Sequence, residues 1–408
     1  MKKKLYTFKF IRYINQLMNQ MLIYYNIITV SLLMVYIFFL MYLRRGFRKL
    51  QRALHSDKMP FVSVVVCAHN EQKNLPDCIE HLRSQVYDSQ KVEFIIVNDR
   101  STDRTGPMIE SVCKQDRRFV YLKITDRIAE FAPKKRAIDT AIKKSRGEII
   151  ILTDADGRPG PYWIKTMVSY YTPDKDMVIG YAPYQVKPAN HLTKQALSLE
   201  YLSIAAVAAS STGIGYPLTC VGTNMSYRKN VYEEIGGFGK FRAHISGDDD
   251  LFLTRVRENK KYNIHFATDA QTHVYNNPPQ LWRKFLHQRM RYASKGFDYP
   301  RKVTIGLIFY FFMNLLLLTG LISFLFNFKL FISSVLLFVL KAMAEFLYMH
   351  KAAKTLNDTR HLKMFPIAAF FHIPYIIIFG ILGQFKHFQW AEEKAEAAVQ
   401  NSVVTESI

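Results

Sequence analysis

The sequence predicts an α/β domain with a parallel β-sheet, held between membrane-spanning helices. Three observations carry this prediction: a charge-free apolar run over Leu22–Leu43, an alternation of strand and helix patterns between residues 61 and 153, and new apolar blocks after residue 302. The predicted parts are residues 1–57 (N-terminal membrane anchor and basic juxtamembrane segment), 58–301 (α/β domain), 302–387 (about three transmembrane segments) and 388–408 (polar tail).

The first apolar run, Leu22–Leu43, is long enough to cross a hydrocarbon core of about 30 Å at about 1.5 Å per residue. Arg44, Arg45 and Arg48 follow it, so the positive-inside rule predicts a cytoplasmic domain and a protein integral to the inner (cytoplasmic) membrane. Residues 1–12 are also basic and would prefer the same side. Either Met18 or Met21 is the true start, or the first segment lies in the membrane interface.

The α/β domain is predicted from runs that alternate along the chain. Short apolar, β-branched runs are typical of strands buried on both faces of a parallel sheet. Such runs are Phe61–Cys67, Val92–Val97, Phe119–Ile124 and Glu148–Thr153, with helical patterns over Asn74–Val86, Thr105–Cys113 and Lys134–Lys144. This regularity predicts a Rossmann-like sheet, in which ligands bind at the carboxyl ends of the strands.

Three apolar blocks, each of nearly membrane-spanning length, follow the α/β domain: Val303–Phe326, Phe328–Tyr348 and Phe365–Phe385. The second block contains Lys341 and Glu345, whose spacing predicts an ion pair on one helix face. The alternative for one block is a helix that lies in the headgroup plane.

The charge and the cysteine positions limit which classes of binding partner we expect. The formal net charge is +22, and much of it sits beside the apolar segments, where it suits anionic membrane lipids. The chain has no zinc-finger spacing and no arginine-rich run, so we expect no nucleic-acid partner. Its four cysteines lie far apart and predict buried thiols rather than a metal or disulfide framework: Cys67, Cys78, Cys113 and Cys220.

Polar residues follow the predicted strands where each strand ends. Asn70 and Glu71 follow the first strand, Asp99 the second, and Asp154 and Asp156 the fourth. Carboxylates gathered at one sheet edge repel one another unless a cation or ligand lies among them. Asp103 either belongs to the acidic cluster after the second strand or is the N-cap of the helix that begins at Thr105.

The pair Asp154 and Asp156 has the chemistry of a divalent-cation site. Mg²⁺ or Mn²⁺ binds carboxylate oxygens and keeps other positions for water and phosphate, where it stabilises a leaving diphosphate. A further cluster, Asp248–Asp250, precedes an apolar-periodic helix. Its carboxylates would suit the helix dipole, or one of them would act as a general base toward an acceptor hydroxyl.

Together these residues resemble the membrane-bound family 2 glycosyltransferases, inverting enzymes with a GT-A fold that include cellulose, hyaluronan and chitin synthases. The resemblance covers roughly residues 60–296. The segments that carry it are PFVSVVVCAHNEQKNL, FIIVNDRSTDRT, the DAD at Asp154, GTNMSYRKNVYEEIGGF, GDDDL and QRMRY. Each is weak alone, but their combination in this order is highly specific.

The resemblance implies a role for each matching residue. Asp99 would hydrogen-bond a uracil ring, Asn70 and Glu71 would line the nucleotide pocket, and Lys134 would approach the pyrophosphate. Asp154 would contact the nucleotide, and Asp156 would hold Mg²⁺ or Mn²⁺. The base would come from Asp248–Asp250; matching GDD to the family's GED nominates Asp249, and matching GDDDL to EDxDL nominates Asp248, with Asp249 preferred.

In the same way, Gln288 and Arg291 would contact the diphosphate and the acceptor end, and an arginine fork suits diphosphate. Tyr292 stands where processive members have Trp, and Asn98 replaces the first Asp of the usual pair. QRMRY also fits an amphipathic interfacial helix.

The sequence therefore predicts transfer of a sugar from a UDP-sugar to a lipid or glycan acceptor at the cytoplasmic membrane face. The three C-terminal spans and Tyr292 favour a single transfer or a short glycan over a processive polysaccharide synthase. A non-catalytic nucleotide-binding membrane module is the alternative from another class, and lost carboxylates would be its signature.

Overall fold

The computed structural model describes residues 2–51, 59–186, 191–279 and 282–385. The predicted tail, 388–408, lies outside these ranges. The chain forms two compact units. We call Met41–Pro278 with Phe346–Ala368 the α/β unit, and Met1–Leu40 with Pro279–Glu345 and Ala369–Ile408 the membrane unit.

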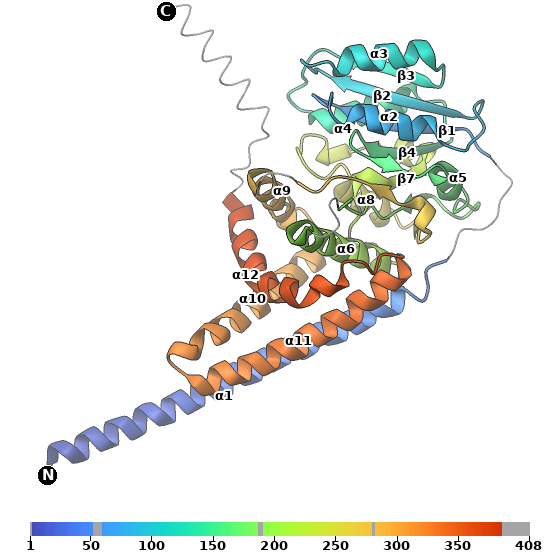
Figure 1. Ribbon diagram of the computed structural model, residues 1–408. Helices are drawn as coiled ribbons and strands as arrows, with labels where there is room; N and C mark the ends of the chain where they lie inside the picture. The colour runs from blue at the N-terminus through green and yellow to red at the C-terminus, as the bar shows by residue number, and fades with distance from the viewer. Residues whose placement is uncertain (1, 52–58, 187–190, 280–281, 386–408) are drawn as a thin grey trace, which may run out of the picture. The chain divides into compact units, whose positions relative to one another are not determined.

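A seven-stranded sheet forms the centre of the α/β unit, in the order β3-β2-β1-β4-β7-β6-β8 (Figure 1). Its strands are β1 (Val62–Ala68), β2 (Val92–Asp99), β3 (Phe119–Ile124), β4 (Ile149–Asp154), β6 (Met177–Ile179), β7 (Met225–Arg228) and β8 (Ile264–Phe266). The four strands that the sequence predicts, β1 to β4, pair in parallel, which confirms the Rossmann-like half. Strand β7, which no sequence pattern predicts, runs antiparallel between β4 and β6.

The helices of this unit include the three that apolar spacing predicts, at α2 (Leu75–Arg83), α3 (Thr105–Gln115) and α4 (Pro133–Lys144). The others are α5 (Trp163–Val168), α6 (Leu192–Gly213), α7 (Lys229–Glu234) and α8 (Asp250–Glu258), and β5 (Arg158–Pro159) pairs with β9 (Val274–Tyr275). Buried aliphatic residues of β1, β2 and β4 pack with α2, α3 and α5 into one core.

Helix α6 lies outside the predicted strand–helix alternation and packs against the ends of α1 and α11. The backbones of Gly46, at the end of α1, and of Ser210 and Gly213 in α6 approach so closely that no side chain fits at Gly46 or Gly213. The Tyr348 hydroxyl of α11 lies 2.7 Å from Ser210 Oγ. The α/β unit thus includes the ends of two long apolar helices, packed on α6.

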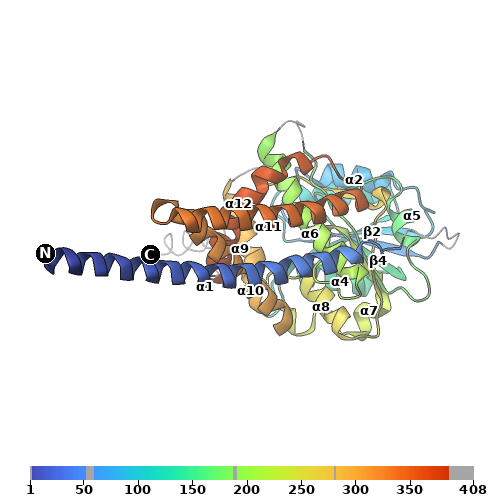
Figure 2. The same ribbon diagram turned by 90° about the horizontal axis from the view of Figure 1, so that it is seen from below.

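The membrane unit is helical. Its elements are α1 (Lys2–Gly46), α9 (Trp282–Ser294), α10 (Arg301–Ile322), α11 (Phe328–Thr355) and α12 (Phe365–Leu382), and α1 and α11 have residues in both units. Four helical stretches are long and apolar enough to cross a membrane: Gln16–Gly46, Arg301–Leu325, Phe328–Thr355 and Leu362–Phe385. Helices α1 and α11 run side by side (Figures 1 and 2), joined by hydrogen bonds such as that between Tyr25 and Ser334.

The predicted ion pair of α11 is present. Lys341 Nζ lies 2.7 Å from Glu345 Oε1, which also accepts a hydrogen bond of 2.7 Å from the Tyr36 hydroxyl of α1. Lys341 is fully buried and Glu345 nearly so. Ionisable groups of an apolar span are costly unless they are paired, so each charge offsets the burial cost of the other, and the Tyr36 hydroxyl links the pair to α1.

We expect Glu345→Leu alone to destabilise the protein by about 3–5 kcal/mol, because it leaves the Lys341 charge buried and unpaired. The matched control is the double variant Lys341→Met/Glu345→Leu, which removes both charges and should cost far less. Thermal unfolding in detergent measures both. Equal destabilisation by the single and double variants would show that the pair has no such role.

Candidate active site

The predicted site residues at the ends of the second and fourth strands lie at one edge of the sheet. Strand β4 ends at Asp154, whose register partner in β1 is Cys67, one residue before the end of that strand. Strand β2 ends at Asp99 and runs parallel to β1. Because parallel strands end at the same edge, the sheet brings Asp99 and Asp154 to its carboxyl side, as the sequence predicts.

Lys134, at the start of α4, joins the two acidic clusters. Its Nζ lies 2.7 Å from Asp154 Oδ1 and 2.9 Å from Asp248 Oδ2. Burial alone would lower the pKa of Lys134, but the charges of Asp154 and Asp248 outweigh it and raise that pKa well above the usual lysine value. The ammonium group is therefore a fixed positive charge between carboxylates that are about ninety residues apart in the chain.

The environment of Asp156 fits a divalent cation. Burial, the neighbouring Asp154 and then Glu71 raise the pKa of Asp156 to about 7. Among the described residues, no group of three or more His, Cys, Asp or Glu is placed to hold a metal ion. A cation beside Asp156 would therefore take its other ligands from diphosphate and water, as Mg²⁺ commonly does. Asp154 is engaged differently, because Thr223 Oγ1 donates to its Oδ2 at 2.5 Å.

The cluster Asp248–Asp250 occupies the start of α8, and its members have different surroundings. Asp248 pairs with Lys134, and Asp250 is buried in the first turn of the helix. Asp249 is the half-buried N-cap residue; its Oδ1 accepts from the Asp250 N–H at 2.7 Å and its Oδ2 from the Gly222 N–H at 3.3 Å. The carboxylate of Asp249 thus caps α8 and is partly exposed to solvent.

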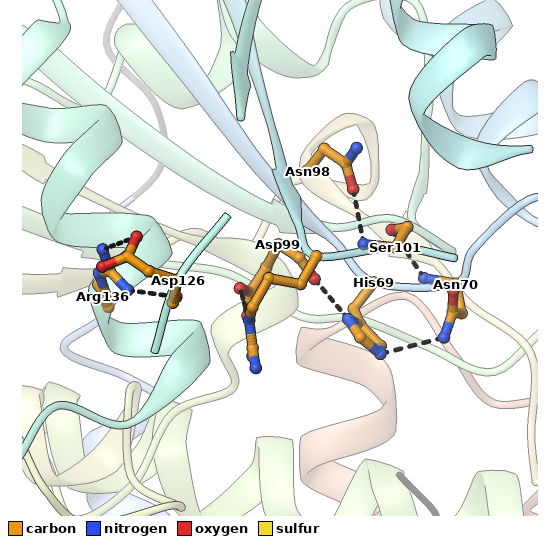
Figure 3. Close-up of polar contacts among 8 residues, drawn as sticks. His69, Asn70, Asn98, Asp99, Ser101, Asp126 and Arg136 are labelled. Carbon is orange, nitrogen blue, oxygen red and sulfur yellow. Dashed lines mark hydrogen bonds and ion pairs between the residues drawn. The ribbon is translucent and has the colours of Figure 1, made fainter. Parts of the chain in front are cut away.

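Polar side chains gather around Asp99 at the ends of β1 and β2 (Figure 3). The guanidinium of Arg100 donates to both carboxylate oxygens of Asp99, from Nε at 2.8 Å and from a terminal nitrogen at 3.1 Å. His69 Nδ1 contacts the Asp99 carbonyl, and its Nε2 lies 3.1 Å from Asn70 Nδ2. Asn70 and Arg100 both have φ of 55°, so each turns the chain sharply at the end of its strand.

Asn98, which replaces the first Asp of the usual family pair, makes two hydrogen bonds through its side-chain amide. Its Nδ2 donates to the Tyr121 hydroxyl at 2.9 Å, while its Oδ1 accepts from the Ser101 N–H at 3.1 Å. The amide of this buried residue therefore uses both its donor and its acceptor.

The chain is similar to several known proteins. Residues 63–236 match the family described as "Glycosyl transferase family 2". Residues 63–236 form a family 2 glycosyltransferase domain. The "Probable glycosyltransferase YdaM" of Bacillus subtilis (strain 168) is 26% identical over 310 residues, or 70% of this chain and 72% of that protein.

Two further similarities are informative. The "Beta-monoglucosyldiacylglycerol synthase" of Nostoc sp. is 26% identical over 59% of this chain and 50% of that protein. The mannosyltransferase PcManGT from Pyrobaculum calidifontis, solved with GDP-Man and Mn²⁺, is 18% identical, covers 90% of this chain and 100% of its own, and has a TM-score of 0.56. That structure shows the shared GT-A fold, which confirms the predicted fold class.

Several residues of the glycosyltransferase site were missed by sequence reasoning. These are Arg100, which binds Asp99, and Thr223, which binds Asp154 alongside Lys134; nothing in their spacing marks either contact. The predicted Gln288, Arg291 and Tyr292 lie on the amphipathic helix α9, where Gln288 Nε2 donates to the Tyr292 hydroxyl at 3.2 Å. That helix belongs to the membrane unit, and the roles of these three residues remain predictions.

We expect Lys134→Met to lower glycosyltransferase kcat/KM by about 10²-fold, because a donor aimed at transition-state charge is lost and two carboxylates stay unneutralised. The same change should strengthen Mn²⁺ binding in the absence of nucleotide, because a competing cation is gone. Steady-state kinetics and Mn²⁺ titration measure the two effects. Lys143→Met is the matched control, since Lys143 lies on the same helix and is 72% exposed. Unchanged kinetics in Lys134→Met would exclude this role.

Proposed function

We propose that this protein is an inverting, metal-dependent glycosyltransferase that moves a sugar from a nucleotide-sugar, a UDP-sugar in the simplest case, to a lipid or glycan acceptor at the cytoplasmic face of the membrane. The observation that carries the proposal is the placement of Lys134 between Asp154 and Asp248. Lys134 joins the nucleotide-sugar side of the site, at the end of β4, to the start of α8, which carries the proposed general base, Asp249.

The chain's own residues supply the steps of the reaction. The carboxylate of Asp99 accepts a hydrogen bond from the imide N–H of the uracil ring, and the neighbouring Arg100 offers donors to a carbonyl of that ring. Asn70 and Glu71 line the nucleotide pocket, and Lys134 neutralises charge on the diphosphate. A divalent cation held by Asp156 would stabilise the charge of the departing nucleoside diphosphate.

Asp249 acts as the general base. As its carboxylate takes the proton of the acceptor hydroxyl, that oxygen forms a bond to the anomeric carbon. The bond from the anomeric carbon to the phosphate oxygen breaks, and the electron pair leaves with the nucleoside diphosphate. A single displacement of this kind inverts the anomeric configuration. The N-cap hydrogen bonds of Asp249 hold its carboxylate in place for this step.

Two observations support a membrane acceptor. Four helical stretches are long and apolar enough to span a bilayer, and the chain resembles a protein named as a glucosyldiacylglycerol synthase. The arginines that follow the first span, Arg44, Arg45 and Arg48, favour a cytoplasmic α/β unit. Anionic membrane lipids would contact these and the other juxtamembrane basic residues.

The test is nucleoside diphosphate release by the detergent-solubilised full-length protein, supplied with native membrane lipids and a panel of UDP- and GDP-sugars. We expect turnover with one donor, dependent on Mg²⁺ or Mn²⁺ and abolished by EDTA. Product size then separates a single transfer from processive synthesis. Nucleotide binding without release from any donor would contradict the proposal and favour a non-catalytic module.

A further inference from the structure

Lys135, the neighbour of Lys134 on α4, is a fully buried lysine. Its Nζ donates three hydrogen bonds, to the carbonyl oxygens of Phe241 at 2.7 Å, His244 at 2.8 Å and Ser246 at 2.8 Å. An ammonium group has three N–H donors, so these three bonds use its full capacity in three directions. The ammonium also lies 5.8 Å from the centre of the Phe238 ring.

The three carbonyls belong to one irregular segment, which we call the base loop (residues 241–249). It runs from a short 3₁₀ helix, Gly239–Phe241, to Asp249, the N-cap of α8. Gly247, one residue before Asp248, has φ of +83°, a backbone conformation that suits glycine. Residues 242–249 form neither helix nor strand, and α8 holds the end of the base loop through the Leu253 N–H, which donates to the Asp249 carbonyl at 2.8 Å.

A second set of contacts ties the base loop to the residues before α4. The Ala132 N–H donates to the Arg242 carbonyl at 2.8 Å, and the Arg242 guanidinium donates to Glu130 at 2.9 Å. Residues 130–135 therefore hold the base loop along most of its length. The innermost of these contacts are those of Lys135.

The geometry of this contact suits a positioning role. One ammonium group holds three carbonyls of a single segment, in three directions. An apolar side chain here would leave those carbonyls without this donor, so the ammonium also contributes to stability. The ammonium group restricts where the backbone of the base loop lies, because it binds three carbonyl oxygens of that loop.

We propose that Lys135 is a positioning residue for the general base: by binding three carbonyls of the base loop, it fixes Asp249 relative to the donor-side carboxylates. The proposal rests on the proposed function above. Adjacent residues of one helix then organise both halves of the site, because Lys134 contacts the carboxylates and Lys135 contacts the backbone that carries Asp248 and Asp249.

The test is Lys135→Met in the full-length protein, which keeps the length of the side chain and removes its donors. We expect kcat to fall by about 10–100-fold, as for a small displacement of a catalytic group, while donor KM and the Kd for the nucleoside diphosphate stay within about two-fold of the wild type. In an Asp249→Asn background the same substitution should cause almost no further loss, because the group that it positions is gone.

Lys143→Met on the same helix is the control, and it should leave kcat unchanged. A kcat of Lys135→Met equal to that of the wild type, a parallel loss of nucleotide affinity, or an equal further loss in the Asp249→Asn background would each overturn the positioning role. If Lys135→Met does not fold, Arg242→Ala, which removes an exposed tie of the same loop, must lower kcat without changing nucleotide affinity, or the proposal fails. Turnover by the wild type tests the proposed function separately.

Discussion

Asp249→Asn is expected to lower kcat by about 10²–10⁴-fold, the contribution of a general base, with little change in nucleotide affinity. The asparagine side chain keeps an oxygen that can accept the N-cap hydrogen bond from the Asp250 N–H, so α8 should remain capped. Loss of activity would then report on the lost base rather than on an unfolded helix. Donor turnover measures kcat, nucleotide binding measures the affinity, and thermal unfolding measures whether the variant remains folded.

The neighbouring carboxylates provide the comparison for this variant. Asp248→Asn weakens the contact with Lys134 and should reduce kcat less than Asp249→Asn does. Asp250 is buried in α8, so Asp250→Asn should act on stability more than on turnover. A larger loss in Asp248→Asn, with Asp249→Asn near the wild type, would reassign the base to Asp248.

Asp156→Ala is expected to lower metal-dependent turnover by about 10³-fold or more, because the stabilisation of a leaving diphosphate by a bound cation is worth several kcal/mol. Mn²⁺ affinity in the presence of nucleoside diphosphate should fall in parallel. The melting temperature of the metal-free protein should stay equal or rise, because burial and the charges of Asp154 and Glu71 disfavour the ionised Asp156 carboxylate.

Asp174→Ala is the control for Asp156→Ala, since it removes a carboxylate that is 65% exposed and pairs only with its neighbour Lys175 among the ion pairs of the described residues. It should change neither turnover nor Mn²⁺ affinity. Full metal-dependent activity in Asp156→Ala would show that the cation binds elsewhere or is not needed.

Sequence reasoning predicted the half of the α/β unit in which local pattern and tertiary structure agree. Strands β1, β2 and β4 are buried on both faces, so their apolar runs identify them, and polar residues mark where they end. The edge strand β3 is only partly buried, and its apolar run identified it as well. The four apolar stretches were also predictable from local pattern, because the thickness of a bilayer sets the length of apolar helix needed to cross it. The Lys341–Glu345 pair followed from helical spacing.

The rest of the fold depends on contacts between distant segments. Strand β7 is a short element placed by pairing with β4 and β6, and α6 is defined by packing on Gly46 and Tyr348. In the site, the cluster at Asp248 was expected near Asp154 only by resemblance, and the ammonium group of Lys134 provides the physical link. Lys135 looks like any helix lysine in the sequence, because its three acceptors lie more than a hundred residues further along the chain.

The most direct test of the central claim follows a radiolabelled sugar from its nucleotide donor into material extracted from membranes that contain the full-length protein. We predict label in the lipid or glycan fraction, dependent on Mg²⁺ or Mn²⁺, with release of one nucleoside diphosphate per sugar and loss of both signals in Asp249→Asn. Label that stays on the nucleotide under every donor, despite measurable nucleotide binding, would contradict the account.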